Sequence, residues 1–196
     1  MKNMRKVFKV MLGVAAVAVT LLTGTKEVKA EETNWFYVEL AEGCTAATVD
    51  MWNVGSEYEY AFGLNGPWQP VTNSDISLST PSNTKVYFRI ISGKDYPKIQ
   101  GNSFRAKNGS VRIGGDILTL LNQDPRPNQM GDGAFQTLFN ECSGIVDASQ
   151  LKLPDYVTPR CYYRMFNNCT NLKSAPNLPA TELEEECYRD FMFALI

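Results

Sequence analysis

The stretch Phe166-Asn167-Asn168-Cys169-Thr170-Asn171-Leu172 repeats, with changes, the stretch Phe139-Asn140-Glu141-Cys142-Ser143-Gly144-Ile145, which begins 27 residues earlier. Leu153-Pro154 likewise returns as Leu178-Pro179, and the Cys-Tyr pair that follows it returns as well. A period of 25 to 27 residues with recurrent leucine, cysteine and asparagine is typical of a solenoid, in which each unit buries its apolar edge only against its neighbours. The sequence therefore predicts stacked units that share one interior.

Each unit reads as an extended segment, a turn at Leu-Pro and a short helix. A helix is expected after Thr158-Pro159, because threonine can cap free backbone N–H groups and proline suits the first helical position. Apolar residues then follow four positions apart, as on one helical face. A second helix is expected after Thr181, where Glu184 completes a capping box. The extended segments around Leu151 and Leu172 should lie on the opposite face from these helices.

The cysteines contribute to the predicted interior. The chain has five, so at least one is unpaired within a monomer. Equivalent residues of stacked units lie about 4.8 Å apart, which leaves disulfides Cys142–Cys169 and Cys161–Cys187 open. Side chains in a stack point the same way, however, so we favour free thiols that fill narrow core positions. The predicted repeat core consists of Phe139, Cys142, Ile145, Cys161, Phe166, Cys169, Leu172 and Cys187.

The middle of the chain has short strand-like runs separated by turn residues. Strands are expected at residues 35–40, 46–52, 57–62, 76–78 and 85–91. Asn108-Gly109 favours a tight turn and predicts a hairpin between residues 104–107 and 110–113. Residues 117–121 fit either a short helix or a last strand. Several short strands at this spacing indicate a small Ig-like β-sandwich.

These patterns give the domain organisation. Residues 1–30 have a basic start, an apolar run from Val10 to Leu22 and small residues near Ala30, which is the pattern of a secretory signal peptide; the apolar run is too short for an ordinary membrane-spanning helix. Residues 31–121 form the predicted sandwich, and the proline- and glycine-rich residues 122–134 form a linker. Residues 135–196 hold the repeats, an array that we expect to be incomplete. The predicted fold is therefore mainly β: an Ig-like sandwich followed by a short leucine-rich-repeat solenoid with short helices.

Composition argues against several functions. Without residues 1–30 the chain has 13 basic and 20 acidic residues, a net charge of about −7, so nucleic acid is not an expected partner. Histidine is absent, which removes the Ser-His-Asp triad, the Cys-His dyad and histidine-bound zinc. We predict no catalytic residue, no metal site and no cofactor, and so no enzymatic activity.

The repeats closely resemble those of the BspA-like leucine-rich-repeat surface proteins of bacteria. The resemblance covers residues 135–192 and is carried by residues 166–172, by Ala175-Pro176-Asn177-Leu178-Pro179-Ala180-Thr181 and by Cys187-Tyr188. The preceding segments 63–68 and 114–121 are similar to domains that often precede such arrays. The resemblance implies a secreted or cell-surface bacterial protein that binds or adheres to host matrix, other cells or glycans.

Two binding functions follow from these observations. The first is recognition of a protein or host-matrix ligand by exposed residues that flank the extended segments, namely Asn171, Lys173 and Ser174. The alternative is a carbohydrate-binding module in which Trp35, Trp52 and Trp68 form a stacking platform on the sandwich, although aromatic residues in strands more often pack in a core. The expected partners are a protein or glycan ligand and further copies of the chain, which would associate through the apolar C-terminal end. After removal of the signal peptide, we expect no transmembrane segment in this chain.

Overall fold

The computed structural model describes residues 34–51, 57–72, 75–94, 96, 98–99, 101–123 and 129–192. The predicted signal peptide lies outside these residues. Within the described part of the chain, no helix has the length and apolar character needed to cross a membrane. Residues Thr33–Ile196 make up one compact unit.

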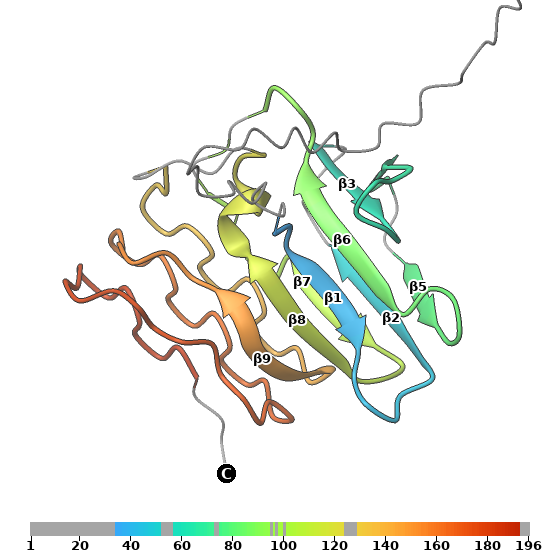
Figure 1. Ribbon diagram of the computed structural model, residues 1–196. Helices are drawn as coiled ribbons and strands as arrows, with labels where there is room; N and C mark the ends of the chain where they lie inside the picture. The colour runs from blue at the N-terminus through green and yellow to red at the C-terminus, as the bar shows by residue number, and fades with distance from the viewer. Residues whose placement is uncertain are drawn as a thin grey trace, which may run out of the picture. The chain divides into compact units, whose positions relative to one another are not determined.

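Two β-sheets face each other across the core of this unit (Figure 1). The larger sheet has six strands in the order β4-β3-β6-β1-β8-β9, and the smaller has three in the order β5-β2-β7. The expectation of a mainly β fold is confirmed. The elements are β1 (Tyr37–Leu40), β2 (Ala46–Met51), β3 (Tyr58–Ala61), β4 (Gln69–Pro70), β5 (Ile76–Ser79), β6 (Lys85–Ile90), β7 (Phe104–Lys107), β8 (Val111–Asp116), the 3₁₀ helix η2 (Ile117–Leu120) and β9 (Ile145–Lys152).

The strands follow from alternation of apolar and polar residues. In β6, Val86, Phe88 and Ile90 are buried while the residues between them are partly exposed, as expected for a strand with one face in the core. The pairs are antiparallel except for β8 and β9, which run parallel. Parallel strands need a long connection, and here residues 117–144 supply it.

The predicted hairpin between residues 104–107 and 110–113 is wrong. The first of these strands, β7, pairs with β2, whereas β8 pairs with β1 and β9. Asn108, with φ 56°, therefore begins a turn that carries the chain from one sheet to the other. Gly109 is required there, because a Cβ would lie 2.0 Å from the carbonyl oxygen of Ala46. Period-two alternation marks both strands but does not reveal that they face the core from opposite sides.

Residues 131–142, 158–169 and 184–191 form three stacked segments, which we call the first, second and third ribbons. The second and third lie where helices were expected. In the second ribbon, the N–H groups of Cys161, Tyr163 and Met165 each donate to the carbonyl three residues earlier. Left-handed φ values recur at every fourth residue, at Arg160 (59°) and Arg164 (52°) and again at residue 168. A φ above zero at the third turn position defines a type II turn, so each ribbon is a run of consecutive turns.

The helix prediction after Thr158 and Thr181 is therefore wrong, and its physical cause is clear. Cys161 and Met165 are buried four residues apart, and a helix and a ribbon of turns both bring such residues to one face. Thr158 also does not cap a helix, because its hydroxyl donates to the carbonyl of Gly131 at 3.0 Å. Backbone hydrogen bonds to the neighbouring ribbon favour the run of turns over the helix, and the spacing of apolar residues gives no information about these bonds.

The remaining N–H groups join one ribbon to the next. Phe139 N–H donates to Met165 at 3.0 Å, and Phe166 N–H donates to Phe191 at 2.8 Å. The first ribbon in turn accepts a hydrogen bond from Phe104 of β7, through the carbonyl of Leu138. The ribbons thus extend the three-stranded layer, while β9 extends the six-stranded layer.

A column of aromatic rings fills the space between the two layers. Phe139 has ring centroids 6.0 Å from Phe36, 5.3 Å from Phe104 and 5.0 Å from Phe166, and Phe191 follows at 5.4 Å from Phe166. The prediction that successive units share one interior is confirmed by these contacts. The regions predicted as two domains joined by a linker at 122–134 share a single core, and residues 124–128 lie outside the described residues.

The cysteines are free thiols, as favoured from the sequence. Cys142, Cys161, Cys169 and Cys187 are buried, and Cys44 is half-buried. Burial raises the pKa of Cys161 and of Cys169 to about 12. A thiol that keeps its proton is a poor nucleophile, so Cys161 and Cys169 act as core side chains; Cys142 and Cys187 are buried in the same core. The other predicted core residues are also buried, except Leu172, which is partly buried.

Candidate binding surface

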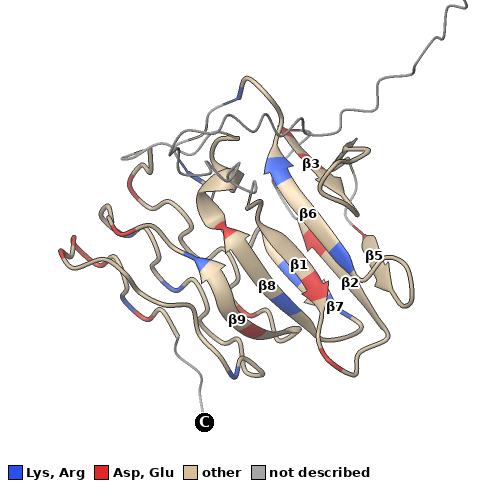
Figure 2. Ribbon diagram, in the orientation of Figure 1, with Lys and Arg blue, Asp and Glu red and all other residues tan. Residues whose placement is uncertain are grey.

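The outer face of the six-stranded sheet carries the side chains that alternate with the core. Figure 2 shows that acidic and basic residues are distributed over β1, β6, β8 and β9 taken together. The strand register places four of them and one serine side by side in one row, which we call the charged row. Its members are Lys85, Glu39, Arg112, Asp147 and Ser174, taken across the sheet.

Three charges of the row form ion pairs with one another. The Glu39 carboxylate lies 3.5 Å from Lys85 Nζ and 3.2 Å from Arg112 Nη2. Exposed pairs of this kind contribute little to stability, about 0 to 1 kcal/mol each. They do fix the positions of the side chains, and Arg112 remains accessible because its side chain is 44% exposed.

A row of tyrosines lies next to the charged row. Tyr37 and Tyr87 pack edge to face with centroids 6.0 Å apart, and Lys85 Nζ lies 4.0 Å above the Tyr37 ring. The Tyr37 ring lies over Gly114, where a Cβ would come within 2.4 Å of the phenol oxygen. Burial, followed by the charge of Glu39, raises the pKa of Tyr37. This phenol is therefore neutral at physiological pH and is available as a hydrogen-bonding group.

The structure brings together two of the three tryptophans of the proposed glycan platform. Trp35 and Trp68 pack edge to face with centroids 5.9 Å apart. Arg89 lies between this pair and Glu59, with its guanidinium carbon 3.8 Å from the Trp68 centroid and Nε 2.6 Å from the carboxylate. One face of Trp68 is thus covered by the guanidinium, and Trp35 is only 8% exposed. Trp52 lies outside the described residues.

The residues predicted from the repeats lie at the far end of the same sheet face. Lys173 N–H donates to Val146 at 2.9 Å, and the Ser174 carbonyl accepts from Ala148 at 2.8 Å, so this segment adds to the sheet beside β9. Ser174 belongs to the charged row. Lys173 is exposed, and the side-chain amide of Asn171 donates to the carbonyl of Ser143 at 2.9 Å. The structure therefore places Ser174 with the sandwich residues and uses Asn171 to join two successive units.

Sequence reasoning missed Arg112 and the other charged sandwich members of this face. Nothing in the chain indicates that β8 and β9 pair in parallel. Without that pairing, the sandwich and the repeats were assigned separate surfaces.

The arrangement suits contact with another macromolecule. Across the described ranges, no group of three or more His, Cys, Asp and Glu side chains is placed to hold a metal ion. The face has tyrosine and arginine side chains held in place by neighbours, and these residue types are enriched at protein interfaces. No protein-family model, no characterised protein and no solved structure shows a significant match to this chain.

Proposed function

We propose that this chain is a non-catalytic recognition protein of the BspA-like leucine-rich-repeat type, exported to the cell surface, where it binds a protein of the host matrix or of another cell. The charged row is the observation that carries the proposal. Because it runs from Lys85 in the sandwich to Ser174 in the repeats, both regions contribute to one contact surface.

The chemistry of the face favours a protein ligand over a small molecule. The side chains are spread across several strands and are fixed by ion pairs and ring contacts, so little conformational entropy is lost on binding. Arg112 supplies a planar donor for carboxylates or carbonyls, and Tyr37 supplies an apolar ring with a polar tip.

Binding to immobilised matrix proteins tests the proposal. Arg112→Glu should weaken binding at least about tenfold, because it reverses a charge in the centre of the row and repels Glu39. The matched control is Lys98→Glu, which makes the same change in charge at an exposed position next to Ile99, whose carbonyl bonds to the first ribbon. Equal loss in both variants, or full binding by Arg112→Glu, contradicts the proposal.

Glycan binding is the second candidate, and the contact between Trp35 and Trp68 favours it. A sugar would stack on the Trp68 face that Arg89 leaves uncovered. Titration with oligosaccharides should then change the tryptophan fluorescence of the protein, and Trp68→Ala should abolish the change. A flat titration across several glycan classes refutes this candidate.

A further inference from the structure

The hydrogen bonds between ribbons all run in one direction along the stack. N–H groups of the first ribbon donate to carbonyls of the second, as Thr137 does to Tyr163 at 2.9 Å. N–H groups of the second donate to carbonyls of the third, as Tyr162 does to Cys187 and Arg164 does to Arg189, each at 3.0 Å. The second ribbon therefore has one edge of acceptors, which faces the first ribbon, and one edge of donors, which faces the third.

The donor edge of the third ribbon is uncovered within the described part of the chain. By the same alternation, it consists of the N–H groups of Glu186, Tyr188 and Asp190, and none of these has an acceptor among the described residues. Large apolar side chains stand at both ends of the ribbon, with Leu183 69% and Met192 52% exposed. Backbone donors beside apolar surface are groups that a partner can satisfy.

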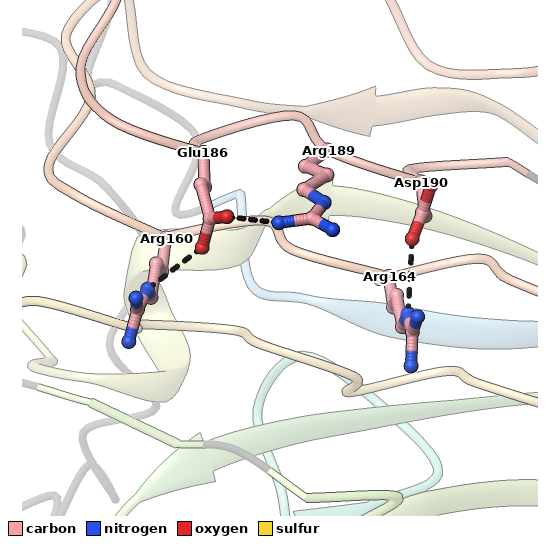
Figure 3. Close-up of polar contacts among 5 residues, drawn as sticks. All are labelled: Arg160, Arg164, Glu186, Arg189 and Asp190. Carbon is pink, nitrogen blue, oxygen red and sulfur yellow. Dashed lines mark hydrogen bonds and ion pairs between the residues drawn. The ribbon is translucent and has the colours of Figure 1, made fainter.

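The contact between the second and third ribbons shows which charges fit across such an edge. Figure 3 shows Arg160 directed at Glu186 and Arg164 directed at Asp190. Arg160 Nε lies 2.9 Å from Glu186 Oε2, and Arg164 Nε lies 3.1 Å from Asp190 Oδ2. Arg189 also contacts Glu186 and lowers the pKa of that carboxyl, mainly through a side-chain hydrogen bond. The four paired residues occupy the left-handed positions of their ribbons. A basic ribbon thus lies on an acidic one, in register, with both charges four residues apart.

We propose that the donor edge of the third ribbon docks a separate polypeptide segment that carries two basic residues four positions apart. The segment adopts the same ribbon of turns, so that its carbonyls accept from Glu186, Tyr188 and Asp190. Its basic side chains lie beside the two carboxylates at the edge, as those of the second ribbon already do from the other side. Leu183 and Met192 provide the apolar contacts at each end.

The same geometry disfavours two other occupants. A second copy that docks symmetrically, edge to edge, would set N–H groups against N–H groups and Glu186 and Asp190 against like charges, so this arrangement is disfavoured. An ordinary β-strand presents donors as well as acceptors along its edge. Half of its groups would therefore face donors, and each buried unpaired group costs free energy.

Amide hydrogen exchange by NMR on the intact protein tests this inference, independently of the charged row. In the protein alone, the amides of Glu186, Tyr188 and Asp190 should exchange fast, whereas those of Tyr162 and Arg164 should be protected. If the amides of Glu186, Tyr188 and Asp190 are already protected in the protein alone, the edge is covered, and the proposal is overturned. Loss of protection at Tyr162 and Arg164 shows the third ribbon to be undocked and overturns it as well.

The probe is a synthetic peptide with the sequence of residues 158–169, both cysteines replaced by alanine, which holds Arg160 and Arg164 four apart. A matched peptide has both arginines replaced by glutamate. The arginine peptide should protect the three edge amides and bind about tenfold more tightly than the glutamate peptide, an advantage that falls with added salt. Equal binding of both peptides, protection elsewhere, or a dimer that protects the edge without peptide refutes the proposal.

Discussion

Replacement of Phe139 by alanine tests whether the sandwich and the repeats are one folding unit. Phe139 is fully buried and contacts Phe36 of the six-stranded layer, Phe104 of the three-stranded layer and Phe166 of the second ribbon. Phe139 therefore joins three parts of the core. The variant removes the ring and leaves a cavity among rigid neighbours.

The expected loss is about 4 kcal/mol, within the roughly 3 to 5 kcal/mol typical of Phe→Ala changes in cores. The ring pairs are already part of this figure and are not added to it. A domain has about 5 to 15 kcal/mol of stability in total, so the variant should remain folded but close to its limit. With a urea slope of about 2 kcal/mol per molar, the midpoint should fall by about 2 M.

Urea unfolding observed by two probes measures this effect. Tryptophan fluorescence reports on the sandwich region, because all three tryptophans lie between residues 35 and 68, and amide exchange at Phe166 reports on the second ribbon. Because the core is continuous, both probes should shift together. The matched control is Phe191→Ala, the same change at the end of the aromatic column, and its shift should be smaller since Phe191 packs against fewer parts of the core. If the ribbon probe shifts while the fluorescence midpoint stays constant, the two regions fold independently and the reasoning is refuted.

Three further predictions concern single positions. Gly144→Ala should destabilise the fold by about 1 to 3 kcal/mol, measured by thermal unfolding, because the new Cβ would lie 2.3 Å from the Ala106 carbonyl oxygen. In native protein, a thiol reagent near neutral pH should label Cys44 first and Cys161 only after denaturation. Burial raises the Cys161 pKa from 9.0 to about 12, so the folded state holds this proton more tightly than the unfolded state does. The free energy of unfolding should therefore decline as the pH rises above 9. Glu141 is exposed and has a φ of 60°. Glu141→Asn should raise the unfolding temperature slightly, whereas Glu141→Val should lower it by an amount equivalent to about 1 kcal/mol, because a β-branched residue is disfavoured at positive φ. The opposite order would show that the backbone changes conformation there.

The strands and the core were largely predictable from the sequence because burial of one face produces a local signal. Val86, Phe88 and Ile90 alternate with polar residues, and all three lie in the core. The repeat period likewise predicted that Phe139 and Phe166 lie at equivalent positions of neighbouring units. In both cases the information lies within a few residues or in a simple repetition.

The ribbons and the shared surface were not predictable in the same way. The four-residue spacing of Cys161 and Met165 fits a helix and a run of turns equally well, and the hydrogen bonds to the next ribbon decide between them. Left-handed φ at Arg160 and Arg164 has no local signal either, because arginine has no preference for that region. The charged row depends on the pairing of β8 with β9, which joins residues distant in sequence.

The two cysteines at equivalent repeat positions show why the sandwich can begin the stack. A few repeats alone are marginal, since a solenoid unit needs neighbours on both sides, and here β7 stands before the first ribbon. As a β-strand, β7 presents an N–H group, and the sulfur of Cys142 accepts from Ala106 N–H at 3.2 Å. The first ribbon presents a carbonyl to the second instead, and the thiol of Cys169 donates to Phe139 at 3.0 Å. Because a thiol can both accept and donate, one residue type fits both the junction with the sheet and the junction between ribbons. Alanine or valine at position 142 would remove the sulfur acceptor of the Ala106 N–H, whereas at position 169 it would remove one of two hydrogen bonds to the Phe139 carbonyl, which also accepts from Cys142 N–H at 3.1 Å.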